Sequence, residues 1–154
     1  MADLAQAFKN DHFPGFTNKP SNINIDNRLV VFSVRDLKDE LRPVAMYIVL
    51  NYIWNLVRSK LKRRIMVVDE AWWMMKNPDS AMFLYGMAKR GRKYYLGITT
   101  ITQDVEDFLK SPYGKPIITN SSLQMLLKQS SAAIDSTQKV FGLTEIEKHY
   151  LLEA

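Results

Sequence analysis

Two adjacent carboxylates at the end of an apolar run are the residues best suited to chemistry in this sequence. The stretch RRIMVVDEAWW, residues 63–73, leads through apolar residues directly into Asp69 and Glu70. A carboxylate at a strand tip can hold Mg²⁺ through water, and a second one can polarise water for attack on a phosphate. Alternatively, the two acids simply cap the next helix. The Trp72-Trp73 pair is interpreted mainly as packing beneath the acids, and secondarily as a contact to a partner.

Polar side chains end a second apolar run further along the chain. The stretch GITTITQD has polar residues at its carboxyl end, namely Thr99, Thr100, Thr102 and Gln103. A polar side chain on a strand beside the acids can contact a γ-phosphate or orient water. Gln103 is the best placed for this role, and Thr100 is a candidate nucleotide contact.

A basic cluster, KRGRKYY at residues 89–95, precedes the second run. Lys89 and Arg90 suit a helix carboxyl terminus, where cations stabilise the helix dipole. Arg92 follows a glycine and precedes a predicted strand, so it lies on a loop that can reach a neighbouring subunit. Together with SKLKRR, residues 59–64, the cluster also permits nucleic-acid binding, although no aromatic stacking platform is interleaved with it.

The elements that position these residues alternate in type. The sequence predicts strands over residues 28–34, 64–69, 94–101 and 123–129. It predicts helices over residues 43–59, from Asn77-Pro78 onwards, over 105–110, and two short ones split at Gly142. Strands without strict apolar alternation, each followed by a helix, indicate a mainly parallel α/β sheet with helices on both faces. Ligands bind at the carboxyl ends of such strands, which is where the two acids lie.

Composition limits the remaining possibilities. The chain has 154 residues, 47% of them apolar, which suffices for one domain with a core. It has no cysteine, which excludes disulfides and thiolate metal sites, and its two histidines argue against a histidine-based metal site. No apolar run is long enough to span a membrane and no signal peptide is evident, so we expect a soluble domain. Residues 1–27 are rich in Asn, Asp, Pro and Gly and predict an irregular lead-in.

The net charge of +5 and the pI near 9.4 suit an anionic partner, although surplus lysine and arginine also simply solvate a surface. Basic residues alone therefore do not select a function. The order of the motifs along the chain is more informative.

The sequence resembles the C-terminal half of the VirB/TraC/TrbE class of conjugation and type IV secretion ATPases, in the HerA–FtsK group of hexameric P-loop motors. Four stretches, in order, carry the resemblance: MVVDEAWWMM, KRGRKYYLGITTITQD, IITNSSLQMLLKQS and FGLTEIEKHYL. The resemblance implies a RecA-like ATPase that uses ATP and Mg²⁺ to power substrate transfer or pilus assembly. It further implies a hexamer at the cytoplasmic face of the bacterial membrane, in contact with other secretion components.

The resemblance also assigns roles to individual residues. Asp69 and Glu70 match the Walker B acids, with Asp69 holding Mg²⁺ through water. Gln103 matches the glutamine after the next strand, and Arg92 matches an arginine finger offered to the neighbouring subunit.

One departure from the family pattern is plain. The phosphate-binding motif G-x-x-x-x-G-K-[ST] does not occur; Gly114-Lys115 is followed by Pro116. We therefore expect residues 28–154 to be the C-terminal part of a RecA-like domain, inactive alone, with the Walker A loop upstream of residue 1. The alternatives are a basic nucleic-acid-binding module or a docking module of a secretion complex without activity of its own.

Overall fold

The structure is a computed structural model that describes residues 27–153. The chain divides into two units, Met1–Phe32 and Ser33–Ala154. All the helices and strands described below lie in the second unit. The predicted irregular lead-in over residues 1–27 lies almost wholly outside the described residues.

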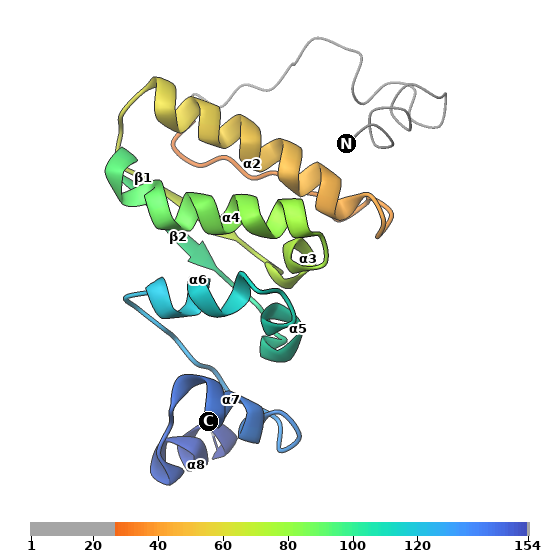
Figure 1. Cartoon of the computed structure of the whole chain (residues 1–154), viewed down its shortest axis with the longest axis vertical. Coiled ribbons are helices and arrows are strands. Elements are labelled where there is room, and N and C mark those ends of the chain that lie inside the picture. Colours follow the sequence, from red (N-terminus) through yellow and green to blue (C-terminus); the bar gives the residue numbers. More distant parts are fainter. Residues whose placement is uncertain (1–26, 154) are drawn as a thin grey trace. The chain divides into compact units, whose positions relative to one another are not determined.

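Helices and strands alternate along the second unit (Figure 1). In chain order the elements are α2 (Arg42–Ser59), β1 (Arg64–Val68), α3 (Trp72–Met75), α4 (Pro78–Arg90), the 3₁₀ helix η1 (Gly91–Tyr94), β2 (Leu96–Thr100), α5 (Val105–Leu109), α6 (Gly114–Asn120), α7 (Ile134–Phe141) and α8 (Glu145–Glu153). This order, with helices between the two strands, confirms the predicted α/β class.

The two strands pair in parallel, from Arg64 opposite Leu96 to Val68 opposite Thr100. Parallel strands need a long crossover connection, and α3, α4 and η1 provide it. Because the strands run in the same direction, their carboxyl ends lie at one edge of the sheet. The predicted strands over residues 64–69 and 94–101 are therefore confirmed, each slightly shorter than expected.

Helices cover one face of this sheet. Met66 and Val68 point into the core, whereas Ile65 and Val67 on the opposite face are 81% and 57% exposed. The core combines side chains from five helices with those of the strands, among them Leu50, Trp54, Val57, Met74, Leu84, Met87, Leu96, Phe108 and Ile117. The expectation of helices on both faces is thus met on one face only, since no described helix buries Ile65 and Val67.

Two of the predicted strands are not strands in the structure. Residues 28–34 and 123–129 form no ladder, and their apolar side chains are largely exposed, including Leu29, Val31, Leu123, Met125 and Leu127. Apolar, β-prone residues become a strand only when a neighbouring strand accepts their backbone hydrogen bonds. Among residues 27–153 the sheet has two strands, and neither stretch pairs with them.

The predicted helix boundaries agree well with the structure. Asn77 caps α4, its Oδ1 accepting hydrogen bonds from the backbone N–H groups of Asp79 and Ser80 at 3.0 and 3.1 Å. Gly142 ends α7 with a φ of +66°, a conformation that glycine adopts without strain. The start of α4 and the split at Gly142 are therefore confirmed.

Helix α6 was not predicted from the sequence. Its first residue, Gly114, packs so closely that a Cβ there would lie 2.0 Å from the carbonyl oxygen of Phe108. Pro116 lies within the first turn, where the missing N–H would have no partner in the helix. A glycine and a proline together indicate a loop from sequence, although here both residues are compatible with a helix start.

Candidate nucleotide-hydrolysis site

Asp69 and Glu70 follow β1 immediately and lie at the carboxyl edge of the sheet. Beyond the paired residues, the backbone N–H of Ile101 donates to Val68 O, and the N–H of Ala71 donates to Ile101 O, both at 2.9 Å. These two bonds keep the segments that leave the strands side by side. The structure therefore brings the ends of both strands together, as the sequence predicted.

Both carboxylate oxygens of Glu70 accept a hydrogen bond. Gln103 Nε2 donates to Oε1 at 2.8 Å, and Trp72 Nε1 donates to Oε2 at 2.5 Å. The backbone of Glu70 has a φ of +49°, in the left-handed region that residues other than glycine seldom adopt. Such conformations cluster at functional sites, where surrounding contacts hold them in place. Glu70 is thus held by its backbone and by both oxygens.

Asp69 could hold a magnesium ion through water, and Thr100 is the candidate nucleotide contact. Asp69 is exposed, and its Oδ1 accepts the backbone N–H of Glu70 at 2.9 Å, which leaves Oδ2 available. Thr100, half-buried, ends β2 opposite Val68. No group of three or more His, Cys, Asp or Glu side chains converges within the described part of the chain. A magnesium ion at Asp69 would therefore complete its shell with water and phosphate, as Mg²⁺ commonly does.

The side chains of Trp72 and Trp73 pack against each other beside Glu70. The Trp72 and Trp73 rings stack with centroids 4.5 Å apart, and Lys76 Nζ lies 4.4 and 3.9 Å from their respective centroids. The packing role predicted for the pair agrees with these half-buried, stacked rings. The bond from Trp72 to Glu70 was missed, because the residue types Trp and Glu two positions apart do not indicate whether the indole N–H turns toward the acid.

Arg92 lies at the other end of the sheet. It belongs to η1, is exposed, and precedes β2, so the length of the strand separates it from Glu70. The structure does not bring Arg92 together with Asp69, Glu70 and Gln103. This position agrees with the prediction that Arg92 faces a neighbouring subunit, and that role stays a prediction.

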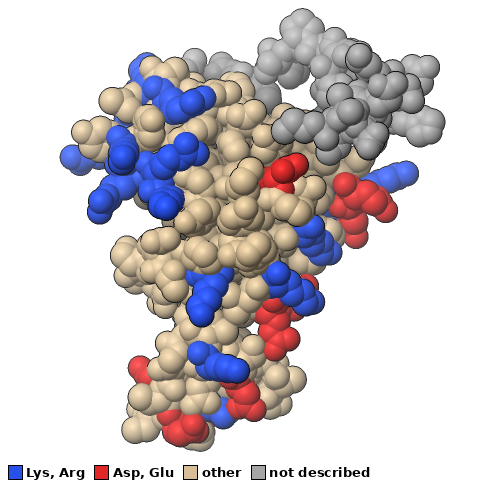
Figure 2. All heavy atoms as spheres, in the orientation of Figure 1, with Lys and Arg blue, Asp and Glu red and all other residues tan. Residues whose placement is uncertain are grey.

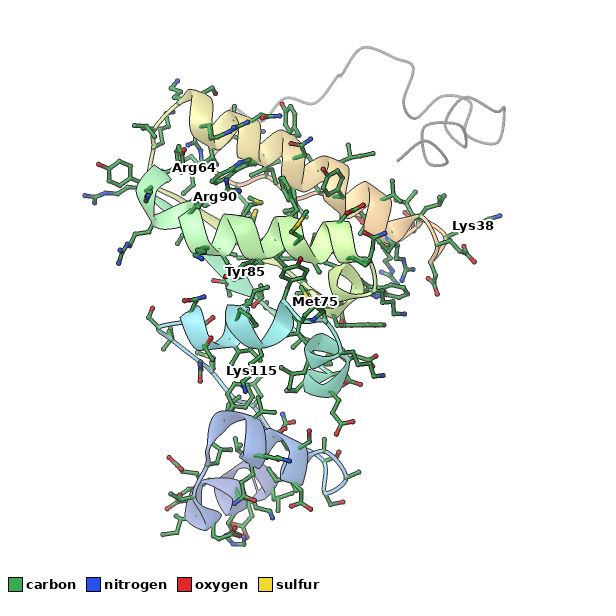
Figure 3. The ribbon with its side chains drawn as sticks, viewed as in Figure 1. Lys38, Arg64, Met75, Tyr85, Arg90 and Lys115 are labelled. Atoms are coloured by element: carbon green, nitrogen blue, oxygen red, sulfur yellow. The ribbon has the colours of Figure 1, made fainter. Side chains whose placement is uncertain are left out.

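Arg92 is part of a basic face at the amino-terminal end of the strands. We define the basic face as Arg58, Lys60, Lys62, Arg63, Arg64, Lys89, Arg90, Arg92 and Lys93. Figure 2 shows lysine and arginine side chains gathered there, and Figure 3 places Arg64 and Arg90 at this end, away from Met75. The guanidinium carbons of Arg58 and Arg90 lie 5.9 and 5.4 Å from the Trp54 ring centroid. None of these cations forms an ion pair within residues 27–153.

Comparison with known proteins matches the whole chain to one family. The profile of the TraG P-loop domain aligns with residues 1–154. The chain belongs to the TraG P-loop domain family. A solved structure, VirB4 of Thermoanaerobacter pseudethanolicus, superposes on this TraG P-loop domain with a TM-score of 0.77 at 30% identity, covering 86% of this chain and 38% of that one. The predicted resemblance to the VirB class and the P-loop fold are thereby confirmed.

Curated relatives of this TraG P-loop domain come from secretion and import systems. The type IV secretion system protein VirB4 of Bartonella quintana (strain Toulouse) is 27% identical over 135 residues, covering 86% of this chain and 17% of that protein. CagE of Helicobacter pylori, also named a type IV secretion system protein, is 27% identical over 86 residues, which is 56% of this chain and 9% of that protein. The DNA import protein CedB of Sulfolobus acidocaldarius is 34% identical over 73 residues, covering 45% of this chain and 12% of CedB. The chain therefore spans under a fifth of the length of each.

Among the described residues of this TraG P-loop domain, no helix combines the length and apolar character needed to cross a membrane. Helix α2 is long enough, but Asn51 and Asn55 interrupt its apolar surface and Arg58 lies in its last turn. Its buried side chains, such as Trp54 and Val57, pack in the domain core instead.

Proposed function

We propose that this chain forms the Walker B part of an ATP-hydrolysing motor that powers substrate transfer or pilus assembly in a type IV secretion or conjugation system. The observation that carries the proposal is the Glu70 carboxylate, held by Gln103 at the carboxyl edge of a parallel sheet. Membership of the TraG P-loop domain family supports it. A carboxylate at this edge, beside a neutral amide, is suited to accept a proton from water attacking a γ-phosphate.

Each residue of the site has a distinct task in this proposal. Glu70 takes the proton from the attacking water, while the Gln103 amide orients Glu70 and contacts the water or the γ-phosphate. Asp69 holds the magnesium shell through water, and Thr100 contacts the nucleotide from the end of β2. Bound Mg²⁺ supplies positive charge that offsets the charge on the phosphates. Arg92 acts on the nucleotide of a neighbouring subunit.

The phosphate-binding loop is the part of an ATP site that these 154 residues do not contain, since G-x-x-x-x-G-K-[ST] is absent. We propose that a longer protein containing this chain supplies it, and we call this the parent protein. In the proposal the parent protein assembles as a hexamer at the cytoplasmic face of the bacterial membrane, together with other secretion components. The chain alone does not hydrolyse ATP.

The decisive experiment separates turnover from binding in the parent protein. Glu70→Gln removes the proton acceptor and leaves the ligand contacts, so turnover should fall at least about 100-fold, the scale of general-base catalysis, with nucleotide binding retained. Asp69→Ala should weaken magnesium-dependent binding as well. Phosphate release and calorimetric titration with Mg-ATP measure the two effects. Near-normal turnover of Glu70→Gln would reject Glu70 as the base.

The basic face favours a second candidate function, binding of a nucleic acid. Residues 41–68 and 80–103 contain no Asp or Glu, so the cations of the basic face have no acidic neighbours in their own segments. A relative of this chain carries the name DNA import protein. A basic surface without neighbouring acids attracts a nucleic acid. Binding releases the counterions of the nucleic acid, so the affinity falls steeply as the salt concentration rises.

A salt titration tests this candidate. Affinity for duplex DNA, measured by fluorescence anisotropy, should fall steeply with salt, and Lys62→Ala with Arg63→Ala should make the fall shallower by about one unit of log–log slope for each lost phosphate contact. The matched control changes Lys115 and Lys139, which lie on α6 and α7, outside the basic face. Equal slopes for all the variants would reject a nucleic-acid site on the basic face.

A further inference from the structure

The indole of Trp72 contacts Glu70 through a specific polar bond. Its Nε1–H donates to Glu70 Oε2 at 2.5 Å, while the other oxygen, Oε1, accepts from Gln103. The two donors come from different segments, one from the segment that follows Glu70 and one from the segment that follows β2. The carboxylate is therefore fixed in orientation as well as in place.

The Trp72 ring is itself immobilised. One of its faces stacks on Trp73 at 4.5 Å, and the Lys76 ammonium lies 4.4 Å from its centroid. Trp72 begins α3, which is anchored in the core by the fully buried side chain of Met74 and by Met75, only 7% exposed. A backbone hydrogen bond from the Trp73 N–H to Glu70 O at 3.0 Å connects α3 to the acid, and one from the Met74 N–H to Ala71 O at 3.1 Å connects it to the next residue. Rotation of the indole away from Glu70 would break the stack.

The chemistry of the indole suits a group that orients a base. An indole N–H donates one hydrogen bond and accepts none, so it cannot compete with Glu70 for a proton. It carries no charge, in contrast to a lysine or arginine that would form an ion pair with the carboxylate. It therefore holds Oε2 without taking over the role of the acid.

We propose that Trp72 is a positioning residue for Glu70, whose indole N–H fixes Oε2 so that Oε1, beside Gln103, is presented to the attacking water. This inference rests on the proposed function of Glu70 as the base. A carboxylate on a flexible side chain samples many orientations, and holding it near the reactive one lowers the barrier. The positioning role of Trp72 requires its indole N–H group, whereas a packing role would require only an aromatic ring at this position.

The first test measures the bond in this chain and requires no activity. The chain has three tryptophans, Trp54, Trp72 and Trp73, hence three indole N–H signals in a ¹⁵N–¹H spectrum, each assigned by its Trp→Phe variant. Glu70→Ala should move the Trp72 signal strongly and the Trp73 signal less, and leave Trp54 in place. A Trp72 signal that moves no more than that of Trp73 would overturn the proposed bond.

The second test uses kinetics of the parent protein with a matched pair of variants. Trp72→Phe and Trp73→Phe both keep a stacked ring under Lys76, and only the first removes the donor to Glu70. Trp72→Phe should lower kcat about tenfold, the scale of one lost hydrogen bond to a charged group, with KM nearly unchanged. Trp73→Phe should retain the wild-type kcat. Urea unfolding of both variants checks that they are equally folded.

The outcomes separate this inference from the proposed function. If Glu70→Gln abolishes turnover while Trp72→Phe and Trp73→Phe have the same kcat, the positioning role is wrong and Glu70 remains the base. If Glu70→Gln retains turnover, the proposed function fails, and the positioning role fails with it even where the spectrum shows the bond. Both the positioning role and the proposed function are supported if Trp72→Phe lowers kcat and Trp73→Phe does not, and if Glu70→Ala moves the Trp72 indole signal more than that of Trp73.

Discussion

Arg92 lies at the end of β2 opposite to the acids, and its position decides how it can act. The strand alone separates the two ends by about 16 Å, at roughly 3.3 Å per residue, so Arg92 cannot contact phosphates beside Glu70 of its own chain. In the parent protein we expect Arg92→Ala to lower turnover by about 10³-fold or more, as loss of an arginine finger does. If Arg92 were only a charge at a helix end, Arg92→Ala would change the free energy of unfolding by under about 1 kcal/mol and leave turnover unchanged.

Mixing two inactive variants tests whether Arg92 acts between subunits. Parent protein with Arg92→Ala, mixed with parent protein with Glu70→Gln, should regain part of the activity, because some interfaces then pair an intact Arg92 with an intact Glu70. Subunit exchange is verified separately, for instance with two tags. Near wild-type turnover of Arg92→Ala alone, or no rescue in assemblies that exchange subunits, would show that Arg92 is not a finger.

At the site, sequence could predict which residues lie together when their position follows directly from the strand that precedes them. Asp69, Glu70 and Gln103 belong to this group, because the carboxyl ends of parallel strands always meet at one edge. The Trp72 bond could not be predicted, since it depends on the left-handed backbone of Glu70 and on the orientation of a single indole. Neither feature leaves a pattern in the sequence.

At the scale of elements, α4 depends on its cap. Asn77 Oδ1 accepts two backbone N–H groups of the first turn, and Ala81 and Leu84 of this helix are fully buried. Asn77→Ala should lower the free energy of unfolding by about 1 kcal/mol, whereas Asn77→Ser, which keeps a capping oxygen, should lower it less. Urea unfolding followed by circular dichroism measures both. Equal midpoints for the two variants would mean that the cap does not stabilise α4.

Helices were more predictable than strands for a physical reason. A helix such as α4 satisfies its backbone hydrogen bonds internally, and Asn77 and Pro78 mark its start. A strand depends on residues far away in the chain. The stretches 28–34 and 123–129 have the composition of strands, but composition cannot show whether a ladder partner is present.

At the scale of the whole molecule, the open face of the sheet should govern how the protein behaves in solution. Ile65 and Val67 lie on that face, and the alternating side chains of Leu123, Met125 and Leu127 are largely exposed as well. Exposed strand edges and apolar faces favour association between chains. We expect light scattering to show self-association that increases with concentration, and we expect Ile65→Thr with Val67→Thr to reduce it.

A matched control is available for this prediction. Ile146 is 69% exposed but lies on α8, away from the sheet, so Ile146→Thr should leave the self-association unchanged. A strictly monomeric wild-type protein over a wide range of concentrations would contradict the prediction.

The chain alone should also bind nucleotide poorly. Backbone N–H groups and a lysine of the Walker A loop provide much of the phosphate binding in P-loop proteins, and these 154 residues lack that motif. Calorimetric titration with Mg-ATP should therefore give a dissociation constant weaker than micromolar. Micromolar or tighter binding would mean that another group holds the phosphates.

The stacked tryptophans also give the protein an optical signature. The centroids of the two indoles lie 4.5 Å apart and their ring planes are inclined by 28°. We expect their electronic transitions to couple and to produce a pair of circular dichroism bands of opposite sign. Trp54, which meets Tyr94 edge-on at 5.1 Å, has no such indole partner. Because one indole of the pair is bonded to Glu70, a displacement of the acid alters the coupling. The natural chromophores of the wild-type chain should thereby report on the geometry of the proposed hydrolysis site without any added label.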